Sequence, residues 1–205
     1  MRFLKPILSI GIILTAYIGD YVVFKSRYSD SFVFRAISDS IVHGSLGFLS
    51  SLMFFSHENH LNLHACALNV IFCTVTSSLI DIDHAIVARS FYLKDLTNLK
   101  HRGICHNTTF WLLLTTILLL YSYINKKLNL YILNFMLILA FTSHHVRDGN
   151  RRGLWFYPFG SSPPIDKKLY VLILAVLPHV IAYFYLMFKG DFSREVFVDH
   201  SSMVV

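Results

Sequence analysis

The feature that most constrains this chain is a succession of apolar segments, each close to the length that crosses a lipid bilayer. A helix of about 20 apolar residues spans the hydrocarbon core. Only 15% of the 205 residues are charged, whereas a soluble domain carries about a quarter. The sequence therefore predicts an all-α fold, a polytopic integral membrane helical bundle, and excludes a soluble globular domain. The six predicted transmembrane helices lie at about 6–24, 32–55, 61–80, 107–124, 130–147 and 169–188.

These spans leave no room for a second domain. We expect residues 1–190 to form one transmembrane domain, with an uncleaved first span, and residues 191–205 to form a mobile tail. We also expect a helix at the membrane interface within 85–99, and irregular backbone in the glycine- and proline-rich stretch 148–168. No disulfide is expected, because Cys66 and Cys73 lie two helical turns apart.

The six spans alternate in direction, so the connections 25–31, 81–106 and 148–168 share one side of the membrane and both termini lie on the other. The first side carries more Lys and Arg, which favours a cytoplasmic location for the long loops. The net charge of +6 is explained by basic residues that flank the spans. We therefore expect membrane lipids as partners and no nucleic acid. The organelle and the oligomeric state are not indicated.

Ionisable residues fall at the ends of five spans, and all these ends lie on the side of the long loops. Such residues are costly in hydrocarbon and usually functional. Solvated side chains without a shared role would have no reason to choose one side repeatedly. The residues are Asp20, Arg35, Asp39, His43, Asp81, Asp83, His84, His101, Arg102, His106, His144 and Asp148.

The spacing of these residues indicates a metal site. His144 and Asp148 are four residues apart, as are Asp39 and His43, so each pair lies on one helix face. Mixed His and Asp ligands suit Zn²⁺, Mn²⁺ or Fe²⁺, and the carboxylates suffice for two ions. The alternative is that His and Asp form hydrogen-bonded pairs that hold helices together, or that Asp81, Asp83 and His84 end a helix where water begins. A negative charge at a helix C-terminus opposes the helix dipole, which makes capping a poor explanation.

A second group of histidines is predicted at the opposite face. His57, His60 and His64 have helical spacing, but only Glu58 lies nearby in the sequence. We interpret them as residues of the membrane interface and not as a ligand set.

Three motifs in order resemble the membrane-bound metal-dependent hydrolases of the LexA-regulated, YdjM-like inner-membrane family. They are Asp81-x-Asp83-His84, His101-Arg102-Gly103-x-x-His106, and Ser143-His144-x-x-x-Asp148 followed by Gly153 and Pro158-Phe159. The resemblance covers about 35–160 and implies a multi-helix membrane protein with a metal-dependent hydrolase site. The family pattern His-Arg-Gly-x-Thr-His-Ser has Thr and Ser where this chain has Cys105 and Asn107. This departure affects the hydrogen bonds that support the ligands more than the ligands themselves.

The resulting hypothesis is a membrane-embedded hydrolase of a phosphoester or ester, with a lipid or another anionic amphiphile as its substrate. The catalytic residues are predicted to be His101, His106 and Arg102, with His101 or His106 as a ligand or general acid and Arg102 as an anion clamp. The predicted metal ligands are Asp39, His43, Asp81, Asp83, His84, His144 and Asp148, with Asp81 flanking the family motif.

Two other functions would use similar residues. An ion or proton transporter also needs intramembrane Asp and His, but it places them near the midplane between repeated halves, and this sequence has no internal repeat. A scaffold descended from an enzyme would keep the spans and lose ligands, whereas every ligand type is present here.

Overall fold

The computed structural model describes residues 3–202, apart from 59–60, 91, 93–94 and 97–101. The described residues contain six long helices and no strands, which confirms the predicted all-α fold and its six spans. The observed bounds are α1 (Leu4–Lys25), α2 (Phe32–Phe55), α3 (Leu63–Leu79), α6 (Thr108–Ile124), α7 (Leu128–Arg152) and α8 (Lys167–Ser202).

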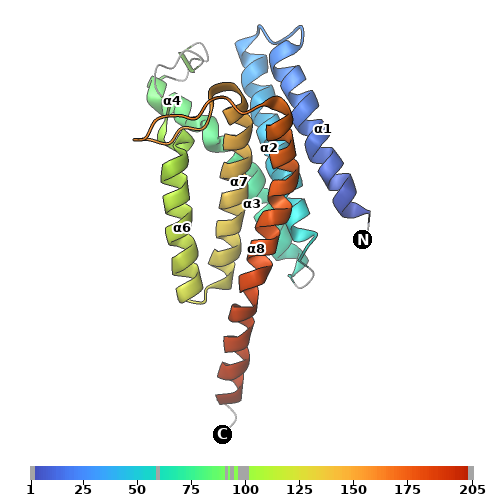
Figure 1. Cartoon of the computed structure of the whole chain (residues 1–205), viewed down its shortest axis with the longest axis vertical. Coiled ribbons are helices and arrows are strands. Elements are labelled where there is room, and N and C mark those ends of the chain that lie inside the picture. The colour runs from blue at the N-terminus through green and yellow to red at the C-terminus, as the bar shows by residue number, and fades with distance from the viewer. Residues whose placement is uncertain (1–2, 59–60, 91, 93–94, 97–101, 203–205) are drawn as a thin grey trace.

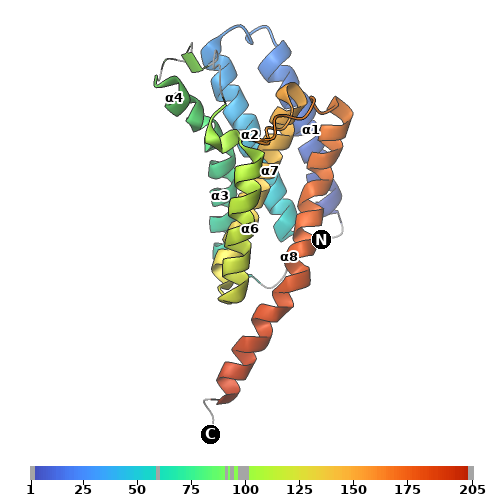
Figure 2. The same ribbon diagram turned by 60° about the vertical axis from the view of Figure 1, so that its left-hand side comes forward.

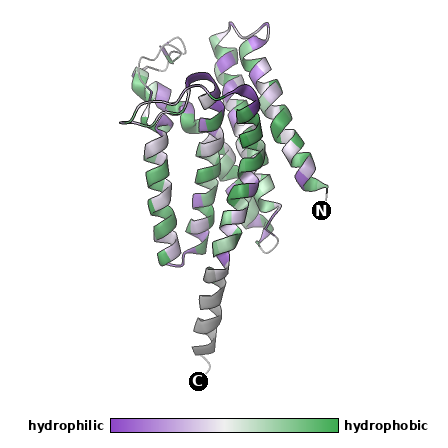
Figure 3. Ribbon diagram, in the orientation of Figure 1, coloured by the Kyte–Doolittle hydropathy of each residue, from purple (hydrophilic) through white to green (hydrophobic). Residues whose placement is uncertain are grey.

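In the part of the chain that the structure describes, three segments are long and apolar enough to cross a membrane: Leu4–Lys25, Leu63–Ala88 and Lys167–Gly190. Helix α6 is apolar but shorter. Helices α2 and α7 are long enough, and they also carry several of the ionisable residues discussed above. Figure 3 shows apolar residues along most of each helix, with hydrophilic residues concentrated where α7 ends and the chain turns toward α8.

The helices stand roughly side by side, and the connections alternate between the two ends of the bundle (Figures 1 and 2). The α1–α2 loop, α4 (Asp83–Ala88), the turn Ile104–His106 before α6, and the α7–α8 connection lie at one end. The chain termini lie away from that end. This arrangement confirms the predicted grouping of the loops, while their cytoplasmic location stays a prediction.

Helix α7 supplies much of the core. Met136 and Leu139 are fully buried, and they belong to a cluster that includes Phe54 of α2, Cys73 of α3 and Tyr185 of α8. A second cluster joins α1, α2 and α8. Helices α2 and α7 therefore contact neighbours on several sides, and His43 of α2 and His144 and Arg147 of α7 are buried inside the bundle.

Helices α2 and α3 pack closely through small residues. A Cβ added at Gly47 would lie 2.7 Å from the Cβ of Ser77, so only glycine permits this approach. The hydroxyl of Ser77 donates to the carbonyl of His43 at 2.9 Å, and that of Ser78 donates to the carbonyl of Ser40 at 2.9 Å. Small residues and interhelical hydrogen bonds are the usual means of association in membranes. They bring the end of α3 beside the first half of α2.

Three boundaries differ from the predictions. Helix α7 continues five residues past 147, because its polar last turn stays helical until Gly153, whose φ of +69° ends it. Within the expected interfacial helix, α4 ends at Ala88, where Arg89 adopts a left-handed conformation, and part of the remaining stretch lies outside the described residues. Residues 153–166 form no helix, as predicted for the glycine- and proline-rich stretch. Helix α8 includes 191–202 of the predicted tail, whose mobility stays a prediction.

Candidate metal centre

Four separate segments meet at the end of the bundle that holds the long connections. Helix α3 continues into a 3₁₀ turn, Ile80–Ile82, which carries Asp81, and then into α4, which begins at Asp83. A second 3₁₀ turn, Ile104–His106, precedes α6. Both turns direct an Asp or His toward the last turns of α7.

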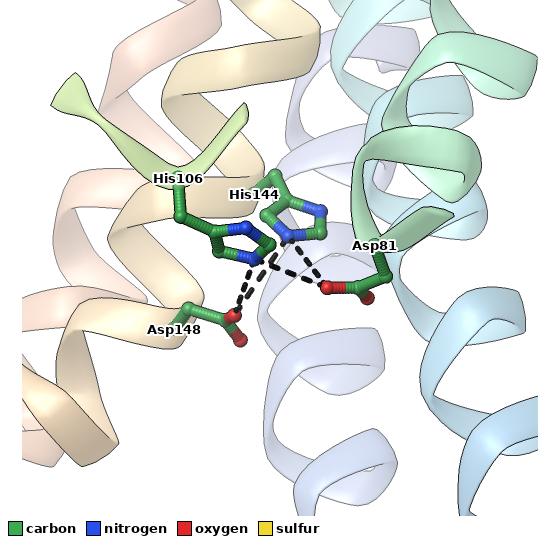
Figure 4. Close-up of side chains that lie close together, drawn as sticks. All are labelled: Asp81, His106, His144 and Asp148. Carbon is green, nitrogen blue, oxygen red and sulfur yellow. Dashed lines mark hydrogen bonds and ion pairs between the residues drawn. The ribbon is translucent and has the colours of Figure 1, made fainter. Parts of the chain in front are cut away.

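Asp81, His106, His144 and Asp148 point toward a common centre (Figure 4). The Nε2 atom of His106 lies 3.1 Å from Asp81 Oδ1 and 3.6 Å from Asp148 Oδ2. The Nε2 atom of His144 lies 3.4 Å from Asp81 Oδ1 and 3.7 Å from Asp148 Oδ2. Two imidazole nitrogens and two carboxylate oxygens thus face one another.

The separations of these atoms fit a tetrahedral ion. Ligand atoms at bonds of about 2.0–2.1 Å in a tetrahedron lie about 3.3–3.4 Å apart, which is within the range of the four distances. His144 is fully buried, and its Nε2 has no hydrogen-bond partner in the structure. A buried nitrogen without a partner is costly, and a metal ion removes that cost. The donor set therefore fits a borderline divalent ion.

Hydrogen bonds on the far side of each ring orient the two histidines. The Nδ1 of His144 lies 3.1 Å from the carbonyl of Ser77, which can only accept, so Nδ1 carries the proton and Nε2 is left as the ligand atom. The Nδ1 of His106 lies 3.2 Å from Asp83 Oδ2 in the same way. Carboxylates and carbonyls commonly hold metal-binding histidines by this means.

Asp83 is buried behind His106 and supports it. Its Oδ2 also accepts the backbone N–H of Cys105 at 3.0 Å. A methyl group at Gly103 would overlap this carboxylate, which explains the glycine in the His-Arg-Gly motif. In this arrangement Asp83 orients His106. Asp83, His84 and His106 also form a group whose donor atoms lie within 4.8 Å of one another, so the role of Asp83 as a direct ligand stays a prediction.

His43 and Asp39 lie on the α2 side of the same centre. His43 is fully buried, stacks on His144 with 3.7 Å between ring centroids, and has a hydrogen-bond partner at neither ring nitrogen. Its Nε2 lies 3.5 Å from Asp148 Oδ1 and 4.0 Å from Asp39 Oδ1.

Arg147 is a buried cation that the sequence analysis did not single out. Its Nε donates to Asp20 at 3.2 Å and its Nη1 donates to Asp39 at 2.7 Å. Asp20 also accepts a hydrogen bond from the hydroxyl of Tyr170. The sequence did contain a signal for this role. Arg147 lies inside a span between two proposed ligands, and aspartates on other spans needed a positive partner.

Arginines surround a cavity of about 350 Å³ next to the metal centre. Arg151 donates to Asp148 at 2.6 Å, and Arg102 donates to the carbonyls of Arg152 and Gly153. The wall also includes apolar residues of the membrane helices. The lining includes Arg35, Ala36, Leu79, His84, Arg102, Arg151 and Arg152.

The carboxylates dominate the electrostatics at His106, the ligand that lies outside the spans. Burial lowers the pKa of this imidazole, but its hydrogen bonds to Asp148, Asp81 and Asp83 outweigh burial and raise the pKa to about 11. The raised pKa of this imidazole indicates a local excess of negative charge, and such an environment attracts a cation.

The remaining predicted residues occupy less central places. His101 lies outside the described residues. His84 lines the cavity, and its Nδ1 donates to the carbonyl of Asp81 at 2.9 Å. Asp81 itself, predicted as a flanking residue of the motif, lies at the centre because the 3₁₀ turn directs it inward.

Cys105 and Asn107 are the two departures from the family motif. Cys105 makes its contacts through the backbone, and Asn107 makes a contact that a serine side chain can also make. Cys105 serves through its main chain, with its carbonyl accepting from His145 at 2.8 Å and from Trp111 at 2.9 Å. Asn107 caps α6, since its Oδ1 accepts from the backbone N–H groups of Thr109 and Phe110. Ser and Asn are both good N-caps, so this exchange preserves the local structure.

The fold and the gathered His and Asp residues define an integral membrane protein of several spans with a candidate metal centre at one end. The family described as "YdjM inner membrane protein" matches residues 39–199, so the chain belongs to this family.

Relatives named Transmembrane protein 267 match most of the chain. The relative from Xenopus laevis is 35% identical over 84% of this chain and 79% of its own length. Those from Danio rerio and Mus musculus are 33% and 30% identical, over 84% and 85% of this chain and 76% and 80% of their own lengths. No solved structure matches the chain.

Proposed function

We propose that this protein is a metal-dependent hydrolase that cleaves a phosphoester or ester bond in an amphiphilic substrate at the edge of the bilayer. The observation that carries the proposal is the convergence of Asp81, His106, His144 and Asp148 beside an arginine-lined cavity. A divalent ion held by these residues supplies an activated water and polarises a phosphoryl or acyl oxygen.

The arginines favour a substrate with a negative charge. Arg35 and Arg152 line the cavity without a carboxylate partner among the described residues, so their guanidinium groups are available to an anion. Guanidinium matches phosphate in a bidentate geometry. A phosphoester is therefore the preferred substrate class, and the apolar residues Ala36 and Leu79 in the wall suit an attached acyl or alkyl chain.

His84 is suited to proton transfer. Its Nδ1 donates to a backbone carbonyl, which leaves Nε2 to face other partners, and the ring lines the cavity. A histidine in this position can protonate a leaving group.

The test is a substrate screen with the full-length protein in lipid nanodiscs. Phosphatidic acid, a soluble phosphomonoester and a carboxylic ester are each incubated with and without a chelator. We expect hydrolysis that requires metal, is lost in His144→Ala, and persists in the matched variant His179→Ala. Hydrolysis that survives both the chelator and His144→Ala would contradict the proposal, as would a metal-loaded protein that cleaves none of the substrates.

The placement of the centre disfavours transport. The described ionisable residues of the centre lie at one end of the bundle, whereas transporters hold their sites near the midplane. Ion flux into proteoliposomes measures this alternative directly.

A further inference from the structure

We infer that the centre holds two cations, which Asp81 and Asp148 bridge, and that His43 and Asp39 complete the second position. This inference rests on the proposed metal centre and adds its nuclearity. Three observations support it: the positions of the two oxygens of each shared carboxylate, the missing hydrogen-bond partners of His43, and the net charge of the residues around the centre.

The two oxygens of each shared carboxylate face different histidines. Asp81 Oδ1 and Asp148 Oδ2 are the atoms near His106 and His144. Asp81 Oδ2 lies instead 4.0 Å from His43 Nε2, and Asp148 Oδ1 lies 3.5 Å from the same nitrogen. One ion cannot use both oxygens of both carboxylates and all three histidines in a tetrahedral set. Two ions can, with each carboxylate as a bridge.

His43 supplies an independent indication of a ligand. It is 0% exposed and has no hydrogen-bond partner at Nδ1 or Nε2. A buried imidazole nitrogen without a hydrogen-bond partner is unfavourable, because it has given up its contact with water. Its Nε2 lies within 4.0 Å of oxygens from Asp39, Asp81 and Asp148. The donor atoms of Asp39, His43 and Asp81 all lie within 4.8 Å of one another, close enough for them to hold an ion together.

The charge balance accommodates a second divalent ion. Five aspartates surround the centre, and two arginines, Arg147 and Arg151, form ion pairs with three of them. Among the described residues, neither Asp81 nor Asp83 has an arginine or lysine partner. With neutral histidines, three negative charges remain, so one divalent ion leaves a net charge of −1 and two leave +1, which suits an anionic substrate.

Two arginines also orient the carboxylates of the second position. Arg147 Nη1 donates to Asp39 Oδ1 and Arg151 Nη2 donates to Asp148 Oδ1, and both of these oxygens face His43. A carboxylate oxygen has two lone pairs, so each can accept one such bond and still bind an ion. The donors thereby orient the carboxylates before any ion arrives.

The experiment counts ions in the full-length protein, purified in detergent, stripped with a chelator and reloaded with MnCl₂ alone. We expect two Mn²⁺ per chain, an electron paramagnetic resonance spectrum of an exchange-coupled pair, and one uncoupled Mn²⁺ per chain in both His43→Ala and Asp39→Ala. The matched variant His57→Ala keeps two.

The outcomes separate this inference from the proposed function. One uncoupled ion in the wild type would overturn the inference and leave the metal centre intact, while no ion would overturn both. Two ions retained in His43→Ala would also overturn the inference. The spectrum of the wild type decides the question without any variant, so a misfolded variant does not obscure the result.

Discussion

Two groups of buried or half-buried polar residues lie at opposite ends of the bundle, and their hydrogen bonding differs. At the end away from the long connections, Lys5 donates to His57 Nδ1 at 3.0 Å, His57 Nε2 lies 3.0 Å from His179 Nδ1, and His179 Nε2 lies 3.2 Å from Ser9 Oγ. We call this set the far-end chain. Lys can only donate, so each hydrogen bond in this chain carries one proton in the same direction. Every ring nitrogen of the two histidines then has a partner.

The metal centre shows the opposite condition. His43 lacks hydrogen-bond partners at both nitrogens, and His144 lacks one at Nε2, although carboxylate oxygens lie close to both. The far-end chain contains four residues whose donor and acceptor atoms satisfy one another, and it contains no carboxylate. The comparison teaches that clustered histidines indicate a ligand site when carboxylates surround them and some of their nitrogens lack a hydrogen-bond partner.

Removing a ligand should produce the largest difference between the two ends. His144→Ala removes a nitrogen that faces both bridging carboxylates, so we expect loss of bound metal and of any hydrolysis. His179→Ala is the matched change in the far-end chain and should leave the metal content unchanged. Elemental analysis of both purified variants makes the measurement, and equal metal loss in the two would refute the distinction.

Removing a counter-charge should have the next largest effect. Arg147 is buried between Asp20 and Asp39, so Arg147→Met leaves buried carboxylates unpaired and should lower the free energy of unfolding by about 3–5 kcal/mol.

Lys189→Met is the matched change at the other end, where Lys189 pairs with Glu58 at 2.5 Å. Glu58 has a further interaction, so the loss should be smaller, about 1–3 kcal/mol. Denaturant unfolding in detergent compares the two variants, and a larger loss in Lys189→Met would contradict this ranking.

Disturbing the support of a ligand should weaken the centre without abolishing it. Asp83→Asn leaves His106 without its carboxylate, and we expect metal affinity to fall roughly 10- to 100-fold. Gly103→Ala should act in the same direction, because its methyl group displaces Asp83. Competitive metal titration provides the measurement, and unchanged affinity in both variants would show that Asp83 does not orient His106.

A change in pH should also affect the two ends differently, with a smaller effect than the substitutions above. The pKa of His106 is raised to about 11, so at neutral pH an incoming ion displaces its proton, and affinity should increase about tenfold per pH unit as pH rises. Burial and the neighbouring Lys5 lower the pKa of His57, so protonation of this ring in the far-end chain is disfavoured. Metal titrations between pH 6 and pH 8 test the slope, and a flat response would contradict displacement of a proton.

The smallest effect is expected for a single neutral hydrogen bond in the far-end chain. Ser9→Ala removes the contact with His179 and should cost about 0.6 kcal/mol, the average for such bonds between membrane helices. Metal content should not change. A loss of metal in Ser9→Ala would indicate that the two ends are coupled, which the comparison does not predict.

Much of the fold could be predicted because hydropathy alone determines where spans begin and end. Helices α2 and α6 match their predicted ranges within one residue. Helix α7 was underestimated because Asp148 to Arg152 are polar and were assigned to a loop, although the last turn of a membrane helix can be polar once it leaves the hydrocarbon.

The candidate site could be predicted in its location and only partly in its geometry. The ends of the spans placed His43, Asp81, His144 and Asp148 together, because alternation of direction determines which ends meet. The orientation of Asp83 behind His106 depends on a backbone turn that no spacing rule indicates. The partner of His57 proved to be His179, which is distant in sequence, while His60 lies outside the described residues.

Ser77 has a consequence that extends beyond the centre itself. Its hydroxyl holds α2 through the carbonyl of His43, and its own carbonyl holds the ring of His144 on α7. The orientation of this imidazole thus depends on how α7 packs against α3 inside the bundle. A change in the bilayer that parted these two helices would release the ring, so we expect the proposed metal centre to respond to the lipid that surrounds it.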